Sequence, residues 1–228
     1  MTMTINTSLL HTAVACAALL AGAWALPAAA QDADVRVTHT AVSAGPDGVK
    51  RTAEFAERVV RRQDQVWIER VVPLGWHTAD DHSKADMSHK HLDTAAASRW
   101  ITRSADGTAG VRLASREDKV LVEVAKTDFE NVGFDGSWAA AYYLIDPAAL
   151  KRMKVASTQG DLVTYTSNEA NRQLKVIWND KLKLPVLVES RSGASSKRTT
   201  VEVLAQTKTL PWDGLKSYTR KDYSDYLD

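Results

Sequence analysis

From residue 35 onward, hydrophobic and polar residues alternate with a period of two, and turn-forming residues interrupt the pattern at short intervals. This alternation is typical of half-buried β-strands, because successive side chains of a strand point to opposite faces of its sheet. Asp47-Gly48 and Asp106-Gly107 are hairpin-type dipeptides, since glycine tolerates the positive φ that such turns require. The pattern predicts strands over 35–42, 49–60, 64–72, 98–104, 109–115, 119–125, 161–167, 172–179, 184–191 and 198–207.

The last three predicted strands each have one apolar face. Between residues 172 and 179, Leu174, Val176 and Trp178 share a face, and Gln173 and Lys175 take the other. We expect apolar faces of the same kind from Leu184, Val186 and Val188, and from Val201 and Val203. One side of the sheet is therefore expected to be buried and the other side to face water.

One helix is well marked in the sequence. Asp146 can accept a hydrogen bond from an exposed backbone N–H as N-cap, and Pro147 suits the first helical position, so a helix is expected from there to about Lys154. No internal repeat, low-complexity segment or linker interrupts the chain, which favours one β domain over residues 31–228.

About ten antiparallel strands with one or a few helices must hide an apolar face. Either a second sheet covers that face, or the sheet curls around a helix. The second solution gives a mostly β (α+β) half-barrel with a groove for an apolar ligand.

Residues 1–30 have the pattern of a secretory signal. From Ser8 to Ala30 there is no charged side chain, and Ala28-Ala29-Ala30 is a small-residue cleavage site of the A-x-A kind. We expect cleavage after Ala30 and release into the periplasm, with no part left integral to the membrane. An uncleaved N-terminal anchor is the alternative, because Met1 to Thr7 carry no Lys or Arg.

The cysteine count and the charge balance limit the covalent links and the binding partners that we expect. Cys16 is the only cysteine and lies within the signal, so no disulfide is expected in the mature chain. Lys and Arg number 29 against 28 for Asp and Glu, a balance that gives no reason to expect nucleic acid or an anionic membrane surface as partner.

The segment from Tyr165 to Ser190 carries a family resemblance. Within it, the chain reads Leu174-Lys175-Val176-Ile177-Trp178-Asn179-Asp180, then Leu184-Pro185-Val186-Leu187-Val188-Glu189-Ser190. This resembles the strand, Asp-turn, Leu-Pro, strand unit of the LolA/LolB periplasmic lipoprotein carrier superfamily, which includes the N-terminal domain of the sigma-E regulators RseB/MucB. Within the unit, Asp180 can cap the turn, and Pro185, which lacks an N–H, suits an edge strand or the beginning of a strand.

The resemblance implies a LolA-like half-barrel that holds lipid chains or senses lipoproteins. The chain departs from the family in two respects: it has no recognisable second domain like that of the sigma-E regulators, and it carries a His-rich segment. No ligand-contacting residue carries over by motif.

That His-rich segment holds four of the six histidines, which are His77, His82, His89 and His91. If His89 and His91 lie on a strand, their side chains share a face about 6 to 7 Å apart, close enough to chelate one ion. Imidazoles with neighbouring carboxylates suit Zn(II) or Cu(II). A solvated or partner-binding polar loop is the alternative, since the spacings match no standard zinc signature.

Aromatic residues supply the candidate ligand-binding set. Residues 129–138 are rich in Gly and aromatic side chains, and would form either a lid over a ligand or a crossover that plugs one end of the half-barrel. Core packing is the alternative role for the tryptophans. The candidate ligand-binding residues are Trp100, Phe134, Trp138, Tyr142 and Trp178.

The sequence favours a non-enzymatic periplasmic protein that binds a lipid, a lipoprotein or a partner segment in an apolar groove, with a role in envelope sensing or sigma-factor regulation. A Zn or Cu binding accessory protein is the alternative. A hydrolase with a carboxylate or serine site is a weaker third hypothesis. Ser137 follows Gly136 as in a nucleophile turn, but the G-x-S-x-G pattern is absent.

Calorimetry with Zn(II) and Cu(II) tests the metal hypothesis. If the histidines chelate an ion, the wild type binds more tightly than the His89→Ala, His91→Ala double variant, because the variant lacks the pair that would share a strand face. Equal, millimolar-only binding by both proteins would end the hypothesis.

Overall fold

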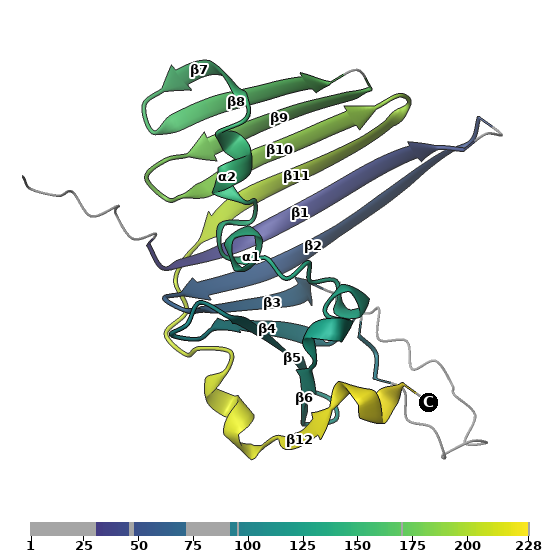
Figure 1. The fold of residues 1–228 in the computed structure, drawn as a ribbon, viewed down its shortest axis with the longest axis vertical. Helices are drawn as coiled ribbons and strands as arrows, with labels where there is room; N and C mark the ends of the chain where they lie inside the picture. Colours follow the sequence, from purple (N-terminus) through teal and green to yellow (C-terminus); the bar gives the residue numbers. More distant parts are fainter. Residues whose placement is uncertain (1–30, 46–47, 72–91, 95, 170, 228) are drawn as a thin grey trace, which may run out of the picture.

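The structure is a computed structural model that describes residues 31–45, 48–71, 92–94, 96–169 and 171–227. The expected signal, residues 1–30, lies outside the described residues. In the described part, the chain forms one twelve-stranded open sheet with the order β12-β6-β5-β4-β3-β2-β1-β11-β10-β9-β8-β7 (Figure 1). Neighbouring strands are antiparallel, except that β12 pairs parallel with β6.

The mostly β class is confirmed, and each of the ten predicted strands has a counterpart. The strands are β1 (Ala33–Ala44), β2 (Lys50–Arg62), β3 (Gln65–Val71), β4 (Ser98–Arg103), β5 (Ala109–Ser115), β6 (Val120–Val124), β7 (Lys154–Gln159), β8 (Leu162–Glu169), β9 (Arg172–Asn179), β10 (Leu184–Ser192), β11 (Ser195–Leu204) and β12 (Thr219–Asp222). The pattern missed the two edge strands, β7 and β12. All residues of both are exposed, so neither has an apolar face that alternation could reveal.

The helices are short and lie mainly between β6 and β7. They are η1 (Lys126–Asp128), η2 (Glu130–Val132), α1 (Trp138–Tyr143) and α2 (Pro147–Leu150), followed near the C-terminus by η3 (Asp213–Ser217) and η4 (Tyr223–Tyr226). The Asp146 cap is confirmed, because its side chain accepts from the Ala148 N–H. The predicted helix was too long: α2 ends at Leu150, and Lys154 already begins β7. Among the described residues, no helix has the length and apolar character needed to cross a membrane.

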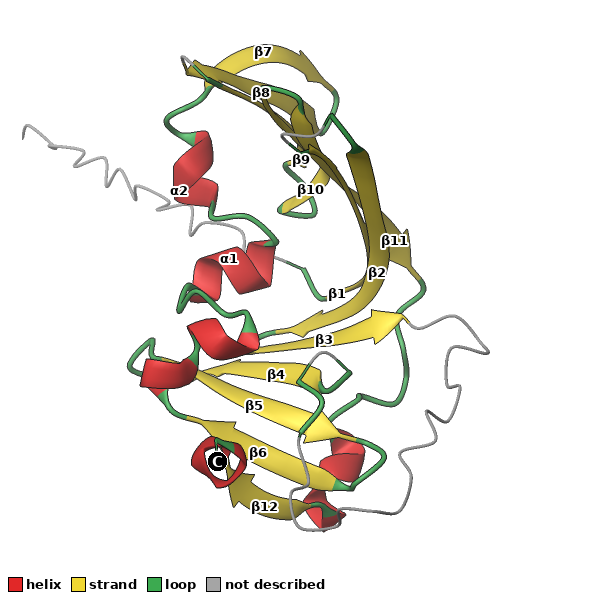
Figure 2. Ribbon diagram, turned by 90° about the vertical axis from the view of Figure 1, so that its right-hand side faces the viewer, coloured by secondary structure: helices red, strands yellow, loops and turns green. Residues whose placement is uncertain are grey.

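The sheet is curved, and Figure 2 shows α1 and α2 on its inner side. The inner face of β1 to β6 forms the main core against the segment that carries η1, η2 and α1. The inner face of β8 to β10 packs against α2, with Leu150, Val176 and Trp178 buried.

The expectation that one side of the sheet faces water is wrong for the half from β2 to β6. There the outer face buries Val60, Trp67, Ala114 and Leu121 beneath Leu215 of the C-terminal segment. Sequence alternation hid this second layer because Trp67 lies between the inward-facing Val66 and Ile68, so β3 has an unbroken apolar run.

Two valines expected on buried faces are exposed. Val186 lies at a bulge between Pro185 and Leu187, which turns its side chain away from the core and leaves it 37% exposed. Val203 is 54% exposed because the pairing of β11 with β10 ends at Thr200. Pro185 is not on an edge strand but lies near the beginning of β10, ahead of its first pair with β11.

Arg61 joins the ends of several elements at the inner face. Its side chain is 2% exposed, and its guanidinium donates to the carbonyl oxygens of Gln31 (2.6 Å), Leu182 (2.9 Å), Tyr142 (3.1 Å) and Lys183 (3.3 Å). It also lies 4.8 Å from the centre of the Tyr142 ring. Burial lowers the pKa of Arg61 from its ordinary value. One side chain thus connects the beginning of the described chain, α1 and the turn between β9 and β10.

Replacing Arg61 should destabilise the fold strongly. We expect Arg61→Met to lower the free energy of unfolding by about 3 kcal/mol, because buried carbonyl oxygens lose their donors. Urea denaturation measures the change, and Arg198→Met, on the exposed part of β11, should cost less than about 0.5 kcal/mol. A variant at Arg61 that unfolds at the wild-type urea concentration would contradict this role.

Candidate functional site

Two adjoining pockets open on the inner face, and they share Glu57 and Ile68. The apolar pocket has a volume of about 190 Å³ and the polar pocket about 260 Å³. The apolar pocket is lined by Val37, His39, Glu57, Val59, Ile68, Leu144, Ile145, Val188 and Thr199. The polar pocket is lined by Phe55, Glu57, Ile68, Arg70, Thr94, Ala97, Arg99, Asn131, Val132 and Gly133.

Strand register places the site residues in rows across the sheet. The first row runs Thr199, His39 and Phe55, from β11 through β1 to β2. The second runs Val37, Glu57 and Arg70, and the third Val59, Ile68 and Arg99. Residues in such rows point to the same face, so the period-two pattern itself directs these polar groups inward.

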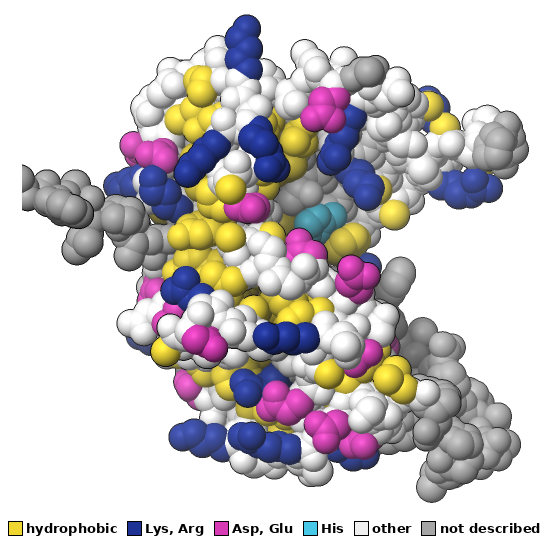
Figure 3. All heavy atoms as spheres, in the orientation of Figure 1, with side chains coloured by type: hydrophobic (Ala, Val, Ile, Leu, Met, Phe, Trp, Pro, Cys, Tyr) yellow, Lys and Arg dark blue, Asp and Glu magenta, His cyan; other side chains and the backbone are white. Residues whose placement is uncertain are grey.

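The connection between α1 and α2 covers the apolar pocket. Ser137 caps α1 by accepting from the Ala140 N–H, and Leu144 ends it in the left-handed region with φ 62°. A non-glycine residue rarely adopts that conformation. Leu144 and Ile145 line the pocket opposite the sheet, so the reversal of the chain places them there. Figure 3 shows hydrophobic side chains gathered on this face, with a histidine and acidic groups beside them.

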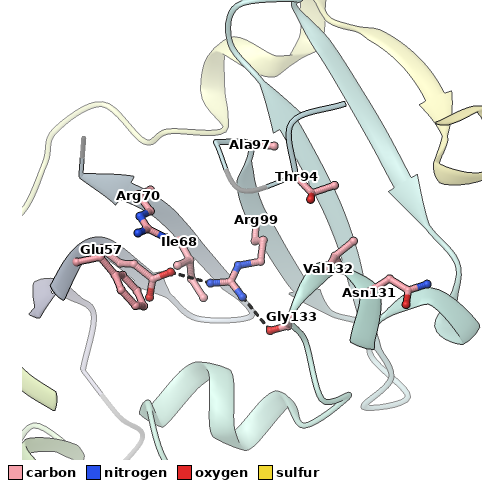
Figure 4. A pocket seen from close by; sticks show the side chains of 10 residues that line it. Glu57, Ile68, Arg70, Thr94, Ala97, Arg99, Asn131, Val132 and Gly133 are labelled. Carbon is pink, nitrogen blue, oxygen red and sulfur yellow. Dashed lines mark hydrogen bonds and ion pairs between the residues drawn. The ribbon is translucent and has the colours of Figure 1, made fainter. Parts of the chain in front are cut away.

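Arg99 organises the polar pocket. It donates to Glu57 Oε1 at 2.8 Å and to the Gly133 carbonyl oxygen at 2.8 Å, as Figure 4 shows. The first contact crosses Ile68 diagonally from β4 to β2, and the second holds the chain after η2 against the sheet. Gly133 has φ 71°, and a Cβ there would approach Arg99 Nη1 to 3.1 Å, so glycine suits this close contact.

Glu57 is the acidic group at the junction of the pockets. His39 Nε2 lies 3.3 Å from Glu57 Oε2, and Arg70 lies opposite Glu57 in the strand register. Burial by itself raises the pKa of Glu57, but the hydrogen bond with His39 and the charges of Arg99 and Arg70 outweigh it and lower the pKa below its ordinary value. Glu57 is therefore an anion at neutral pH.

Thr199, His39 and Glu57 form a hydrogen-bonded chain, with His39 Nδ1 3.1 Å from Thr199 Oγ1. The three side-chain types resemble a nucleophile, base and acid. Acyl transfer also needs N–H donors aimed at a developing oxyanion. Here β1 pairs with strands on both sides, so the backbone groups around His39 serve the sheet.

The five predicted ligand-binding aromatics do not line either pocket. Trp100 lies on the outer face, stacked on Trp212 with ring centres 6.3 Å apart. Trp138 stacks on Tyr142 at 5.1 Å in the main core, so these two are brought together. Phe134 and Trp178 are buried in separate clusters. Their role in ligand binding stays a prediction.

The segment expected to be a lid or a plug packs into the main core. Phe129 and Phe134 lie 5.1 Å apart with tilted rings, and both are buried with Val132. This packing favours the crossover interpretation. Ser137, the candidate nucleophile, has its hydroxyl engaged as the cap of α1.

The predicted metal ligands His77, His82, His89 and His91 lie outside the described residues. Within the ranges that are described, no three His, Cys, Asp or Glu side chains come together in a way that could hold a metal ion. The sequence analysis missed His39, Glu57, Arg70 and Arg99. A signal was present, since Glu57 lies between Phe55 and Val59, with which it shares the inward face of its strand.

No family model matches the chain, and no curated protein matches it. Solved structures show distant likeness. PNGF-II gives a TM-score of 0.37 and 13% identity over 86% of this chain, which spans only 32% of the PNGF-II chain. An uncharacterized conserved protein from Thermus thermophilus gives 0.35 and 8% identity, with 83% of this chain and 90% of that chain covered. A DUF1329 family protein from Desulfovibrio piger gives a TM-score of 0.34 and 8% identity, and the match covers 82% of this chain and 90% of that chain.

The ion pair at Glu57 predicts a specific pH dependence. The pKa of Glu57 is lower in the folded state than its ordinary value of 4.5. Ionised Glu57 therefore stabilises the fold at any pH above 4.5, and this stabilisation is lost as the pH falls through the pKa that Glu57 has in the folded protein. Urea denaturation of Glu57→Gln and wild type should therefore differ most near neutral pH and converge in acid. A difference that stays constant across this range would contradict the ion pair.

Proposed function

We propose that this protein is an exported, non-enzymatic binding protein of the periplasm that holds an apolar chain of a lipid or lipoprotein in the inner-face pockets. The observation that carries the proposal is the apolar pocket, where six aliphatic side chains surround a space that no side chain of the described residues fills. The sequence pattern of residues 1–30 supports export.

The dimensions favour a chain-like ligand. Pockets that enclose a whole drug-sized molecule usually measure about 300 to 1,000 Å³. The apolar pocket alone, at about 190 Å³, is smaller and suits one end of an apolar chain. Because the two pockets meet at Glu57 and Ile68, one elongated ligand can occupy both.

The scaffold also favours binding without large rearrangement. The pocket floor consists of central strands paired on both sides, so the positions of Val37, Val59 and Ile68 are fixed by the ladder. Leu144 and Ile145, on the connection between α1 and α2, cover the pocket from the other side. The resemblance of the segment Tyr165 to Ser190 to the lipoprotein carriers points to the same class of ligand.

Filling the apolar pocket should reduce binding of a fluorescent fatty acyl probe. We expect Val188→Phe to weaken probe binding about tenfold, because a larger side chain occupies the space of the ligand. Val186→Phe is the matched control, since it adds the same volume to an exposed position of the same strand.

Probe titration with thermal unfolding of each variant separates lost binding from lost folding. Lipid found by mass spectrometry in a solvent extract of the purified protein would support the proposal further. A well-folded wild type that binds no acyl probe would overturn it. Ester hydrolysis that disappears in His39→Ala would contradict the non-enzymatic assignment.

A further inference from the structure

We infer that the polar pocket binds an oxyanion head group, a carboxylate or a phosphate, through Arg70 with help from Arg99. The inference rests on the proposed function and adds the chemical class of the ligand: an apolar chain that ends in an anion. The hydrogen bonds of the arginines on this part of the sheet distinguish Arg70 from the others.

Arg70 differs from its neighbours on the sheet. Arg58, on the outer face, pairs with Asp34 and Glu69, and Arg99, in the polar pocket, pairs with Glu57. The guanidinium of Arg70 makes no hydrogen bond or ion pair with any described residue. Its N–H donors are therefore available, as far as the described chain goes, to a group that enters the pocket.

An aromatic ring holds Arg70 in place. Its guanidinium carbon lies 4.2 Å from the centre of the Phe55 ring, and Phe55 in turn stacks on His39 at 4.7 Å. A guanidinium stacked on a ring keeps its planar edge of N–H donors exposed, which is the geometry that binds carboxylate or phosphate bidentately. Figure 4 shows Arg70 and Arg99 on the same side of the pocket as Glu57.

The charges of the polar pocket favour an anion. Its lining contains two guanidiniums, Arg70 and Arg99, and one carboxylate, Glu57, which leaves one positive charge in excess. Glu57 already pairs with Arg99 and His39, so its own charge is largely neutralised. Thr94 and Asn131 are uncharged and can add hydrogen bonds at the rim.

The junction of the pockets fixes the orientation of the ligand. Ile68 lines both pockets, and beyond it the apolar pocket continues to Ile145 and Val188. An anion on Arg70 therefore directs the attached chain along Ile68 into the apolar pocket. A cationic or neutral head group would not offer the N–H donors of Arg70 a negatively charged acceptor.

Competition against the fluorescent acyl probe tests the head group with three ligands that share one chain: laurate, lauryl phosphate and lauryl alcohol. On wild type, we expect both anions to bind about tenfold more tightly than the alcohol, because an arginine bonded to an oxyanion adds a charge-assisted interaction. The advantage should shrink at high salt, since the pocket is partly open. Whichever anion binds better shows whether the pocket prefers a carboxylate or a phosphate.

Variants separate the head group from the chain. Arg70→Gln should remove the advantage of the anions and leave the alcohol unchanged, whereas Glu57→Gln should increase the advantage because Arg99 is released. Arg198→Gln, which removes the same charge from the outer face, should behave as wild type. Because Arg70 is exposed, its replacement should lower the thermal unfolding temperature only slightly, through the lost contact with the Phe55 ring and the lost attraction to Glu57.

The outcomes distinguish this inference from the proposed function. If all three ligands bind wild type equally, or if Arg70→Gln keeps the preference for anions, the head-group inference is wrong and the proposed function stands. If wild type binds none of the three, the proposed function itself fails.

Discussion

The structure depends on how a single curved sheet closes its inner face. A twelve-stranded sheet that curls must bury that face, and here the segment between β6 and β7 fills the concavity. Arg61 secures the filling at one end, because its guanidinium binds carbonyl oxygens from α1, from the turn after β9 and from the residues before β1. The Arg61 guanidinium forms no ion pair within the described part of the chain, and it can remain buried because carbonyl dipoles replace water in this way.

The same arrangement explains why a pocket remains. The helices are too short to cover the whole inner face, since α1 has six residues and α2 four. The chain reverses at Leu144, between the two helices. Leu144 and Ile145 therefore face the sheet across the apolar pocket, at a place that neither helix covers. Polar groups from β1, β2 and β11 point into the space left over, and they satisfy one another through His39, Glu57 and Thr199.

The two halves of the sheet are stabilised differently. From β2 to β6 the sheet is buried on both faces, with Trp67 fully covered on the outside. From β7 to β9 only the inner face is covered, and β7 is exposed throughout. Local openings should therefore begin at the β7 edge, because fewer apolar contacts hold it. The apolar pocket lies where the two halves meet, over β1, β2, β3, β10 and β11, and the polar pocket continues from it over β2, β3 and β4. All of these strands have partners on both sides.

The sequence by itself determined the local elements. Alternation located ten strands, Asp146 and Pro147 located the beginning of α2, and glycines marked turns such as that at Gly107, whose φ is 85°. These features depend on residues near one another in the chain, so a linear pattern records them. Tertiary structure alone decided which strands lie at the edges, which face of β3 to β6 receives a second layer, and where the aromatics go. Trp100 points away from the pockets because it follows the inward-facing Arg99 on β4, and Trp212 of the C-terminal segment stacks on it at the outer face, a contact that no local pattern specifies. Likewise, Arg99 reaches Glu57 only because β4 and β2 flank β3, a relation set by pairing between distant segments.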